Sequence, residues 1–542
     1  RLKSIAGLLD VGDVQSVPLD ARTMTADKAA GYCFSADMDG ATWGADDARL
    51  ALLARGCVPD AVDAAWVQNH FRWVVWSSAS LARRLPARWH EFWSAERVLG
   101  LLRHRYEREY ELGERSALRR VLEADAAPQR LIVLCVASIA GSGADTRVEV
   151  TDGWYSIQAQ VDAVLAQAIG RGRLRAGDKI ACAGLSARGI ADGVEPLSAE
   201  SRGATLLLSA NCVRRACWDA KLGFQRRRAM VMALSAVHRQ GGVVGATLDV
   251  LVMRRYPRRF MEYTADGQRI VRSEKEEERV ALAFAEARAA RMQELLEERQ
   301  ARRDTAGTSG AGDRTAESTC NDDEAAAVLE VVEQEQPQRQ VHPLLRMLVC
   351  DYPARPYRDP GASEGTLAVV TVWRPGPIEP ADLAEGSRVL IAGAAVSTYC
   401  RSAPAAAGAS LSLSVRPAAG SLRPAAVDMQ VVARSRYRQR TTLRIDELQR
   451  AAACQEVDVV GETESCCAGA GGQMSVLRLR STDRGGAVCF ADVEFPRSLF
   501  GSISPAAGAL VTVRNCQYTS PMHGGDTAVP RLFAGDVADF VL

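Results

Sequence analysis

The spacing of the apolar residues changes near residue 130, and this change limits the folds that the chain can adopt. Before it, Trp66, His70 and Trp73 recur at helical intervals and therefore share one face of a helix. After it, apolar residues come in short runs such as residues 131–136, which are typical of buried β-strands. At about 100 to 200 residues per domain, a chain of 542 residues is expected to form three to five domains.

The helical part is predicted to span residues 61–125. Trp76 extends the aromatic stripe, and Ser94 is a suitable N-cap for a helix over 95–110. The tryptophans could form a platform for stacking bases or the core of a helical bundle. We favour the core, because aromatic residues on one helix face are usually buried. Residues 1–60 show no clear period, and their fold is left open.

The strand-forming part has an element order that recurs along the chain. Five predicted strands follow residue 130, with a short helix between the third and the fourth, which is the layout of an OB-fold barrel. These strands lie at 131–136, 148–150, 154–161, 179–182 and 205–210. Similar sets begin at residues 245 and 456. We therefore predict an α+β multidomain chain with a helical domain and three OB-fold β-barrels in tandem.

A charged segment interrupts the second set of strands. Residues 273–303 are predicted to form a helix rich in Ala, Glu, Arg and Leu, and 324–335 could be the returning helix. Residues 306–323, mostly Gly, Ser, Thr and Asp, are of the kind that stays mobile. The predicted domains are the helical domain at 1–127, the first OB-fold at 128–222, the second at 223–446 with a short helical insertion at 273–340, and the third at 447–542.

Motifs that indicate catalysis are missing from the sequence. There is no G-x-x-x-x-G-K-[ST] phosphate loop and no H-E-x-x-H zinc motif. The 14 cysteines include no C-x-x-C pair, a distribution typical of buried thiols in a reducing compartment. No uncharged apolar run reaches the about 18 residues that cross a bilayer. We expect a non-enzymatic binding protein of the cell interior, without cofactor, metal or membrane span, and interpret a chain that begins at Arg1 as an excised region.

Charge is segregated by segment although the formal net charge is only +1. Residues 214–259 carry eleven basic residues against Asp219 and Asp249, and residues 401–444 carry eight arginines against Asp428. Of the 67 basic residues, all but five are arginines. Arginine offers a planar fork that suits phosphate, although a GC-rich genome produces the same bias and is the simpler explanation.

Arginines and aromatic residues are the candidates for nucleic-acid binding, because OB barrels stack bases on aromatic rings within a cationic groove. In the second barrel the candidates are Arg254, Arg255, Tyr256, Trp373, Arg374 and Arg388. In the third they are Arg478, Arg480, Phe490, Arg514 and Tyr518. The segment between these barrels adds Arg436, Tyr437 and Arg438, and it could contact phosphate or be a solvated linker. Trp373 and Phe490 lie in predicted strands and could equally be core residues.

Longer motifs follow one another in a fixed order from about residue 45 to the end of the chain. They are WVQNHFRWVVW at 66–76, SAERVL at 94–99, RSALRR at 115–120, LCV at 134–136, TDGWY at 151–155, KLGF at 221–224, WRP at 373–375, EVDVVG at 456–461 and LFAGD at 532–536. In this order they resemble the C-terminal DNA-binding region, a helical domain plus OB-folds, of the breast cancer type 2 susceptibility protein family.

The resemblance implies a module of a homologous-recombination mediator that acts in the nucleus. It implies that single-stranded DNA runs over the second and third barrels, and that regions outside this fragment help to load a RecA-like recombinase in double-strand break repair. A small acidic partner, the split-hand/split-foot protein that is also a proteasome lid subunit, is expected along the helical domain and the first two barrels. The expected partner surface is Trp66, Trp73, Arg83, Arg84, Arg97, Arg103, Trp154 and Tyr155.

The chain departs from the family pattern in two places. The tower, the family's long helical insertion in the second barrel, has room here only for a stub between residues 273 and 340. Near the end of the third barrel, where the family often has a tryptophan, this chain has Gln517-Tyr518. An alternative function is a protein-interaction scaffold of the repair machinery in which DNA contact is secondary.

Overall fold

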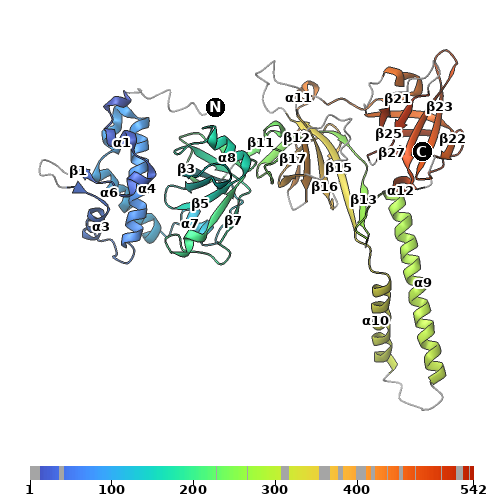
Figure 1. The fold of residues 1–542 in the computed structure, drawn as a ribbon, viewed down its shortest axis with the longest axis horizontal. Helices are drawn as coiled ribbons and strands as arrows, with labels where there is room; N and C mark the ends of the chain where they lie inside the picture. The colour runs from blue at the N-terminus through green and yellow to red at the C-terminus, as the bar shows by residue number, and fades with distance from the viewer. Residues whose placement is uncertain are drawn as a thin grey trace. The chain divides into compact units, whose positions relative to one another are not determined.

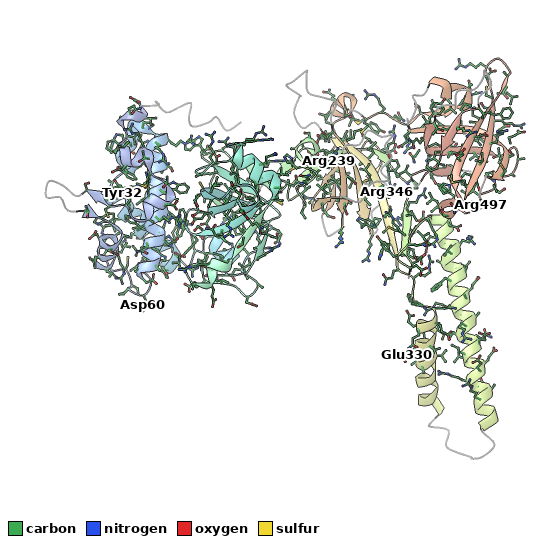
Figure 2. The ribbon with its side chains drawn as sticks, viewed as in Figure 1. Tyr32, Asp60, Arg239, Glu330, Arg346 and Arg497 are labelled. Atoms are coloured by element: carbon green, nitrogen blue, oxygen red, sulfur yellow. The ribbon has the colours of Figure 1, made fainter. Side chains whose placement is uncertain are left out.

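A computed structural model describes residues 13–35, 42–226, 229–264, 266–306, 317–352, 366–375, 383–397, 411–416, 421–435, 437–450, 456–469, 472–501, 503–519, 529–535 and 537–541. The chain divides into two compact units, and each is described by itself. Unit 1 comprises residues 1–248 with 391–396, and unit 2 comprises 249–390 with 397–542. Figure 1 shows helices in the first part of the chain and, in the rest, sheets together with the long helices α9 and α10. Figure 2 adds the described side chains.

The helical region of unit 1 is built around one long helix, α4 (Ala64–Arg84). The elements before it are η2 (Val14–Ser16), α1 (Leu19–Thr23), α2 (Ala26–Ala30), β1 (Phe34–Ser35), β2 (Thr42–Trp43) and α3 (Ala45–Ala54). Those after it are η3 (Pro86–Arg88), α5 (Trp89–Phe92), α6 (Ala95–Tyr106), η4 (Glu107–Glu111) and α7 (Ala117–Leu122). The predicted N-cap is confirmed, because Ser94 Oγ accepts the Arg97 N–H at 3.2 Å.

The aromatic stripe of α4 is core, as expected. Trp66, His70, Trp73 and Trp76 are 2%, 0%, 1% and 8% exposed. The three tryptophans pack with residues of α1 to α3 and α6 in one apolar cluster. The favoured interpretation of the tryptophans is therefore confirmed, and the stacking platform is excluded because no ring face reaches the surface.

An eight-stranded sheet follows the helical region in unit 1. Its strands are β3 (Ile132–Ala140), β4 (Arg147–Thr151), β5 (Ser156–Val161), β6 (Lys179–Cys182), β7 (Ser186–Arg188), β8 (Thr205–Leu208), β9 (Val213–Arg215) and β10 (Gly223–Phe224). Its helical turns are η5 (Gly143–Asp145), α8 (Ala163–Gly170) and η6 (Glu200–Gly203). The helix α8 lies between the third and fourth strands, where the sequence predicts it. After this sheet, unit 1 adds β11 (Val231–Met232), η7 (Leu234–Ala236) and β18 (Ala394–Val396).

Unit 2 contains two further sheets. The strands of the first are β12 (Thr247–Arg255), β13 (Arg259–Tyr263), β14 (Arg269–Ser273), β15 (Val341–Asp351), β16 (Leu367–Trp373), β17 (Arg388–Ile391), β19 (Leu411–Val415) and β20 (Leu422–Ala425). Those of the second are β21 (Thr442–Arg444), β22 (Glu456–Ala468), β23 (Met474–Thr482), β24 (Val488–Pro496), β25 (Leu510–Thr519), β26 (Arg531–Phe533) and β27 (Asp539–Val541). The short helices are α11 (Met429–Arg434), η10 (Ile445–Arg450) and α12 (Arg497–Phe500).

The three sheets repeat one topology. Each begins with three antiparallel neighbours, which are β3-β4-β5, β12-β15-β16 and β22-β23-β24. The third of these strands then pairs parallel with a later strand, in the pairs β5–β8, β16–β19 and β24–β26. In the third sheet, the antiparallel pair β22–β25 closes the ring. The predicted fold class, a helical region followed by OB-type barrels, is confirmed.

The insertion leaves the second barrel between its first two long strands. The hairpin β13–β14 leads into α9 (Glu274–Ala306), and α10 (Glu317–Glu335) returns to β15. The two helices lie side by side (Figure 1). Arg288 pairs with Glu333 at 2.8 Å, and Arg291 with Glu335 at 2.8 Å. The predicted mobile segment falls largely on residues 307–316, which lie outside the described residues.

None of the helices in the described ranges has the length and apolar character to cross a membrane. Within those same ranges, no group of three or more His, Cys, Asp or Glu side chains is placed to hold a metal ion.

Candidate nucleic-acid interface

A pocket of about 390 Å³ lies where the second and third barrels meet in unit 2. Its lining residues are Arg255, Tyr256, Pro257, Arg258, Ala384, Glu385, Arg440, Arg514, Asn515 and Asp539. Four arginines therefore border one concave surface against two carboxylates. Three of the predicted DNA-binding residues, Arg255, Tyr256 and Arg514, come together here.

Strand ends place these side chains. The strand β12 ends at Arg255. Pro257 follows two residues later, and its backbone has no N–H to donate to a neighbouring strand. Arg258 is exposed in the short interruption between β12 and β13, which both pair with β15. Arg514 is exposed on β25, a strand of the third barrel. The surface thus depends on two sheets being held together.

An ion network joins the two barrels beneath this surface. Arg440 donates to both oxygens of Asp458, at 2.9 and 2.8 Å, and to Glu385 at 2.7 Å. Asp458 Oδ1 also accepts the Asn515 N–H at 2.8 Å. Burial acts to lower the pKa of Arg440, but its hydrogen bonds to Glu385 and Asp458 outweigh burial and raise the pKa above its ordinary value. Arg440 is therefore a fixed cation that fastens one barrel to the other.

Tyr256 lies in this joint and not on the surface. It is 2% exposed, and its hydroxyl donates to Glu456 Oε2 at 3.0 Å. Burial raises the pKa of Tyr256, and burial also raises that of Glu456. The prediction that Tyr256 stacks on a base is corrected, because its ring is enclosed between the barrels.

Tyr518 is also a core residue, at 6% exposure. A β-bulge explains why the strand pattern misplaces it. On β25, three steps from Val513 to Cys516 match two steps on β22, and Asn515 in between has a φ of +56°. The extra residue reverses the alternation, so that Val513 and Tyr518 both point inward while Arg514 points out. The stacking role predicted for Tyr518 is corrected on this ground.

Several predicted arginines are neutralised by carboxylates. Arg388 holds both oxygens of Asp249 at 2.8 and 2.6 Å, and Arg478 holds both oxygens of Asp492 at 2.7 and 2.8 Å. Arg480 lies 3.1 Å from Glu462. An arginine engaged in a bidentate pair contributes little charge to a groove. Their role in DNA binding stays a prediction that the pairing weakens.

Arg254 and Arg438 are turned towards backbone oxygens. Arg254 Nη1 donates to the Arg438 carbonyl at 2.9 Å, and Arg438 Nη1 donates to the Ser435 and Tyr437 carbonyls at 3.0 and 2.8 Å. Tyr437 is half-buried, and its ring lies against Gly386. The segment is folded onto the barrel, which argues against a solvated linker. Arg436 lies outside the described residues.

Trp373, Arg374 and Phe490 stay near the surface. Trp373 is half-buried, and its Nε1 donates to Ser414 Oγ at 2.9 Å. Arg374 is exposed with a φ of +47°, and its Nη2 lies 3.1 Å from His342 Nδ1. Phe490 is half-buried and pairs in register with Arg480. These three residues do not line the pocket between the barrels. Their DNA contact stays a prediction.

Arg258 and Arg440 are not among the DNA-binding residues that the sequence predicts. Arg258 lies within the basic segment 214–259, next to the sequence neighbours that were chosen. The signal that could have found it is the proline that interrupts the strand directly after its basic end. Arg440 falls in the basic stretch before the third barrel, but its partners are 55 and 18 residues away.

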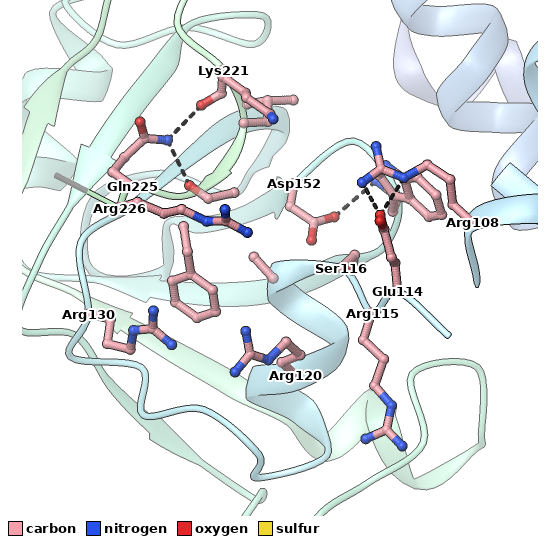
Figure 3. Close-up of a pocket in the computed structure, with 15 residues that line it drawn as sticks. Arg108, Glu114, Arg115, Ser116, Arg120, Arg130, Asp152, Lys221, Gln225 and Arg226 are labelled. Atoms are coloured by element: carbon pink, nitrogen blue, oxygen red, sulfur yellow. Dashed lines mark hydrogen bonds and ion pairs between the residues drawn. The ribbon is translucent and has the colours of Figure 1, made fainter. Parts of the chain in front are cut away.

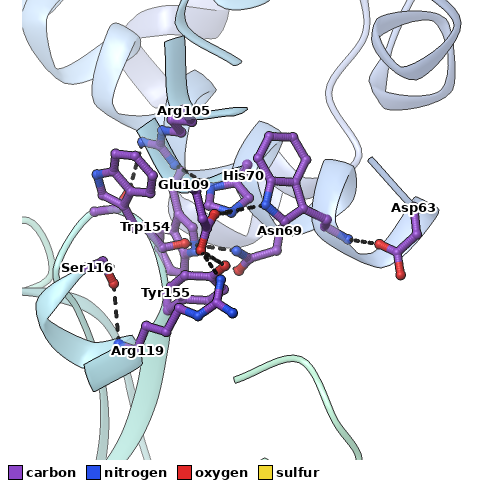
Figure 4. Close-up of polar contacts among 12 residues, drawn as sticks. Asp63, Asn69, His70, Arg105, Glu109, Ser116, Arg119, Trp154 and Tyr155 are labelled. Carbon is purple, nitrogen blue, oxygen red and sulfur yellow. Dashed lines mark hydrogen bonds and ion pairs between the residues drawn. The ribbon is translucent and has the colours of Figure 1, made fainter. Parts of the chain in front are cut away.

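Some of the residues predicted to bind the acidic partner are buried in the core, and the others lie at or near the surface. Trp66, Trp73 and Tyr155 are no more than 3% exposed, so their prediction as surface residues is corrected. Figure 4 shows the reason: side chains from α4, η4, α7 and the first barrel converge on Glu109. Its carboxylate accepts Trp66 Nε1 at 3.0 Å, Tyr155 Oη at 2.6 Å and Arg119 Nη1 at 2.5 Å. These residues join the helical region to the barrel.

His70 completes this joint in its neutral form. Arg105 Nη1 lies 3.0 Å from His70 Nδ1, which must accept, so the ring proton is on Nε2, 3.4 Å from Glu109 Oε2. Burial lowers the pKa of His70 to about 4. Burial acts to raise the pKa of Glu109, but its hydrogen bonds to His70, Tyr155 and Trp66 prevail and lower it to about 2.

The remaining partner candidates lie at or near the surface. Arg97 is exposed, and Arg103 is exposed and paired with Glu107 at 3.0 Å. Arg84 is exposed with its guanidinium 5.3 Å from the Trp218 ring centroid. Arg83 is half-buried and donates to the Ala21 carbonyl at 2.7 Å. Trp154 is half-buried, and the Cζ atom of Arg105 lies 5.1 Å from the centroid of its ring.

Comparison with known proteins places the first part of the chain. Residues 25–112 match the model described as BRCA2, helical, and residues 116–226 match BRCA2, oligonucleotide/oligosaccharide-binding, domain 1. Two Arabidopsis thaliana proteins, BREAST CANCER SUSCEPTIBILITY 2 homolog A and homolog B, are each 32% identical over 299 residues. The match covers 52% of this chain and 26% of each relative. The chain thus spans about a quarter of the length of the curated relatives it matches.

Among solved structures, the Ifi202 HINa domain in complex with 20bp dsDNA is 12% identical. The match covers 37% of this chain and 84% of the solved chain, with a TM-score of 0.21. The family models and the two plant relatives carry the assignment. Residues 25–226 are therefore similar to the helical domain and the first OB domain of the BRCA2 family, with the helical match at 25–112 and the OB match at 116–226.

Proposed function

We propose that this chain is the single-stranded DNA-binding module of a homologous-recombination mediator in double-strand break repair. The strand lies across the joined second and third barrels, at the pocket bordered by Arg255, Arg258 and Arg514. The module performs no catalytic step, acts in the nucleus, and serves a RecA-like recombinase that is bound through other regions of the protein. The small acidic split-hand/split-foot protein binds the helical region and the first barrel.

The cationic surface of unit 2 carries this proposal. Arg258 and Arg514 are exposed, and among the described residues no carboxylate oxygen lies within 4.0 Å of either guanidinium. The Arg440 network fixes the two barrels beneath them, so the two cations are held on one surface. Phosphates are attracted to arginines that have no internal counter-ion, and neutralising them releases bound salt ions.

The acidic partner is supported by the exterior of the helical region. Arg84 and Arg97 are exposed, and no ion pair involves either of them in the described ranges. Trp154, half-buried at the first barrel, adds an apolar surface in the same unit. A flexible acidic chain is bound by such arrangements of surface arginines and aromatic rings.

The test is a titration of the whole chain into a labelled oligothymidine at two salt concentrations. Replacing Arg258 and Arg514 with alanine is expected to weaken binding about tenfold per charge-assisted hydrogen bond and to reduce the salt dependence by about 0.7 for each phosphate that is no longer neutralised. Arg269→Ala is the matched control, because Arg269 is an exposed arginine of the β14 hairpin away from the pocket. Its affinity is expected to stay within twofold of the unsubstituted chain.

Two outcomes would contradict the proposal. An oligothymidine that does not bind at low salt removes DNA binding altogether. Binding that is unchanged in Arg258→Ala with Arg514→Ala, while the acidic partner still co-purifies, makes the chain a protein scaffold in which DNA contact is secondary.

A further inference from the structure

A second cationic pocket lies in unit 1, at the edge of the first barrel. It has a volume of about 660 Å³ and is drawn in Figure 3. Six basic residues take part in its lining, namely Arg108, Arg115, Arg120, Arg130, Lys221 and Arg226. In Figure 3, the guanidinium groups of Arg120, Arg130 and Arg226 are directed towards its middle, whereas Arg115 points away.

Three segments of the chain meet to form it, at residues 108–130, 152–154 and 221–226. Arg120 lies on α7, and Arg130 comes just before β3. Phe224 lies in β10, which pairs with β3 through the Phe224–Ile132 register. The Gln225 side chain donates to the Lys221 and Gly223 carbonyls at 2.8 and 3.0 Å, which fixes the loop that carries the other cations.

The Phe224 ring organises two of the arginines. The Cζ atom of Arg130 lies 4.3 Å from the ring centroid, and that of Arg120 lies 5.8 Å from the same centroid. A guanidinium held on an aromatic ring loses little further freedom when it binds a ligand, because its plane is already set. The two forks are therefore presented to the pocket in a preorganised state.

The carboxylates of the pocket are engaged elsewhere. Glu114 pairs with Arg108. Asp152 Oδ1 accepts the Trp154 and Tyr155 N–H groups at 2.9 and 3.0 Å, and Oδ2 accepts the Leu118 N–H at 2.7 Å. Arg115 pairs with Glu123 and Asp125, outside the pocket.

Four cations are consequently left without an internal counter-ion. They are Arg120, Arg130, Lys221 and Arg226. Within the described ranges, no carboxylate oxygen lies within 4.0 Å of their charged nitrogens. Like charges gathered around one cavity repel one another, so an anion bound there is stabilised by all of them.

We infer that this pocket binds backbone phosphates of single-stranded nucleic acid, as a binding site separate from the one on unit 2. The inference rests on the proposed function, which brings such a strand to the chain. A phosphate presents several oxygens in a tetrahedral arrangement and can engage more than one guanidinium fork, whereas a carboxylate fills a single fork. The half-buried rings of Phe224 and Trp154 in the lining offer faces or edges to an adjacent base.

The test uses the whole chain and an oligothymidine of about 30 nucleotides, long enough for more than one OB site. Arg130→Ala with Arg226→Ala is expected to lower the affinity about tenfold for each charge-assisted hydrogen bond that is lost, and to lower the salt dependence by about 1.4, the value for two phosphates that are no longer neutralised. Arg171→Ala with Arg188→Ala is the matched control, because both are exposed arginines of the same barrel outside the pocket. An unchanged thermal transition in both double variants shows that the fold is retained.

Further arms separate this site from the others. With Arg258→Ala and Arg514→Ala also present, Arg130→Ala and Arg226→Ala are expected to remove most of the residual binding. If the proposed function is wrong, Arg258→Ala with Arg514→Ala leaves the oligothymidine affinity unchanged. Unchanged affinity and salt dependence in the unit 1 double variant overturn the inference. The inference is also overturned if the unit 1 double variant binds a polyglutamate peptide more weakly but binds oligothymidine unchanged. That result assigns the pocket to an acidic protein segment.

Discussion

The junction between the helical region and the first barrel and the junction between the second and third barrels are both closed around buried carboxylates. At the first, Glu109 is 6% exposed and accepts from three residues, with neutral His70 3.4 Å away. At the second, Asp458 is held by Arg440, while Glu456 has one hydrogen bond, from Tyr256. The second carboxyl oxygen of Glu456 is buried without a partner among the described residues.

The two carboxyl groups consequently have opposite pKa shifts. The pKa of Glu109 is lowered to about 2, because donors surround it, and that of Glu456 is raised, because burial dominates. A carboxylate that is fully hydrogen-bonded favours its charged form, and one that is half-satisfied favours the proton. Substitutions and changes of pH are therefore expected to destabilise the two junctions differently.

The largest effect is expected for Glu109→Ala. It leaves Arg119, His70 and the Tyr155 hydroxyl in the junction without their acceptor, which is expected to lower the free energy of unfolding by about 3 to 5 kcal/mol. Tryptophan fluorescence during urea denaturation measures it, because eight of the nine tryptophans lie in unit 1. The exposed neighbour Glu111 provides the control, Glu111→Ala. A loss below 1 kcal/mol in Glu109→Ala would show that the network does not hold the junction.

A smaller effect is expected for Arg440→Ala. Glu385 and Asp458 then face each other without their shared cation, but the Arg440 and Glu385 side chains are 21% and 18% exposed, so water can compensate in part. We expect a loss of about 2 to 3 kcal/mol. Hydrogen exchange of β22 and β25 amides measures it, with Arg480→Ala, an exposed ion pair, as the control. Equal protection in both variants would mean that the barrels do not depend on this network.

Acidification is expected to weaken unit 1 by about 2 kcal/mol between pH 7 and pH 5. Folded His70, with a pKa of about 4, stays neutral, whereas the unfolded chain binds a proton below about 6.5. The stability that depends on neutral His70 is fully present above a pH of about 6.5 and is lost as the pH falls towards 4. Glu109 adds its own loss only below its ordinary pKa of 4.5, down to about 2.

The measurement is the same fluorescence transition across this pH range, and His70→Gln is expected to flatten it. Glu456 acts in the opposite sense. Its raised pKa favours the folded state below the ordinary value of 4.5, and this contribution is lost as the pH rises through the folded pKa. A unit 1 transition that is independent of pH from 7 to 5 would contradict the neutral form of His70.

The sequence predicts the barrels well because their signals are local. Runs of apolar residues, the helix after the third strand and the Ser94 cap all depend on neighbours within a few positions. The candidate site is predicted poorly, because its chemistry depends on distant partners. Arg388 is neutralised by Asp249, which is 139 residues away. The bulge at Asn515 turns Tyr518 inward, and strict alternation cannot anticipate an added residue.

The smallest effect is expected for Arg478→Ala, and it sharpens the difference between paired and unpaired arginines. Asp492 engages both arms of Arg478 on an exposed part of the sheet, so we expect a change in stability of at most about 1 kcal/mol and an oligothymidine affinity within twofold. Asp492→Asn is the informative counterpart. It removes the negative charge that neutralises the Arg478 guanidinium, so the affinity for oligothymidine is expected to rise. If Arg478→Ala instead weakens binding as strongly as Arg514→Ala, then pairing with a carboxylate does not silence an arginine on these barrels, and exposure alone decides which cations meet the strand.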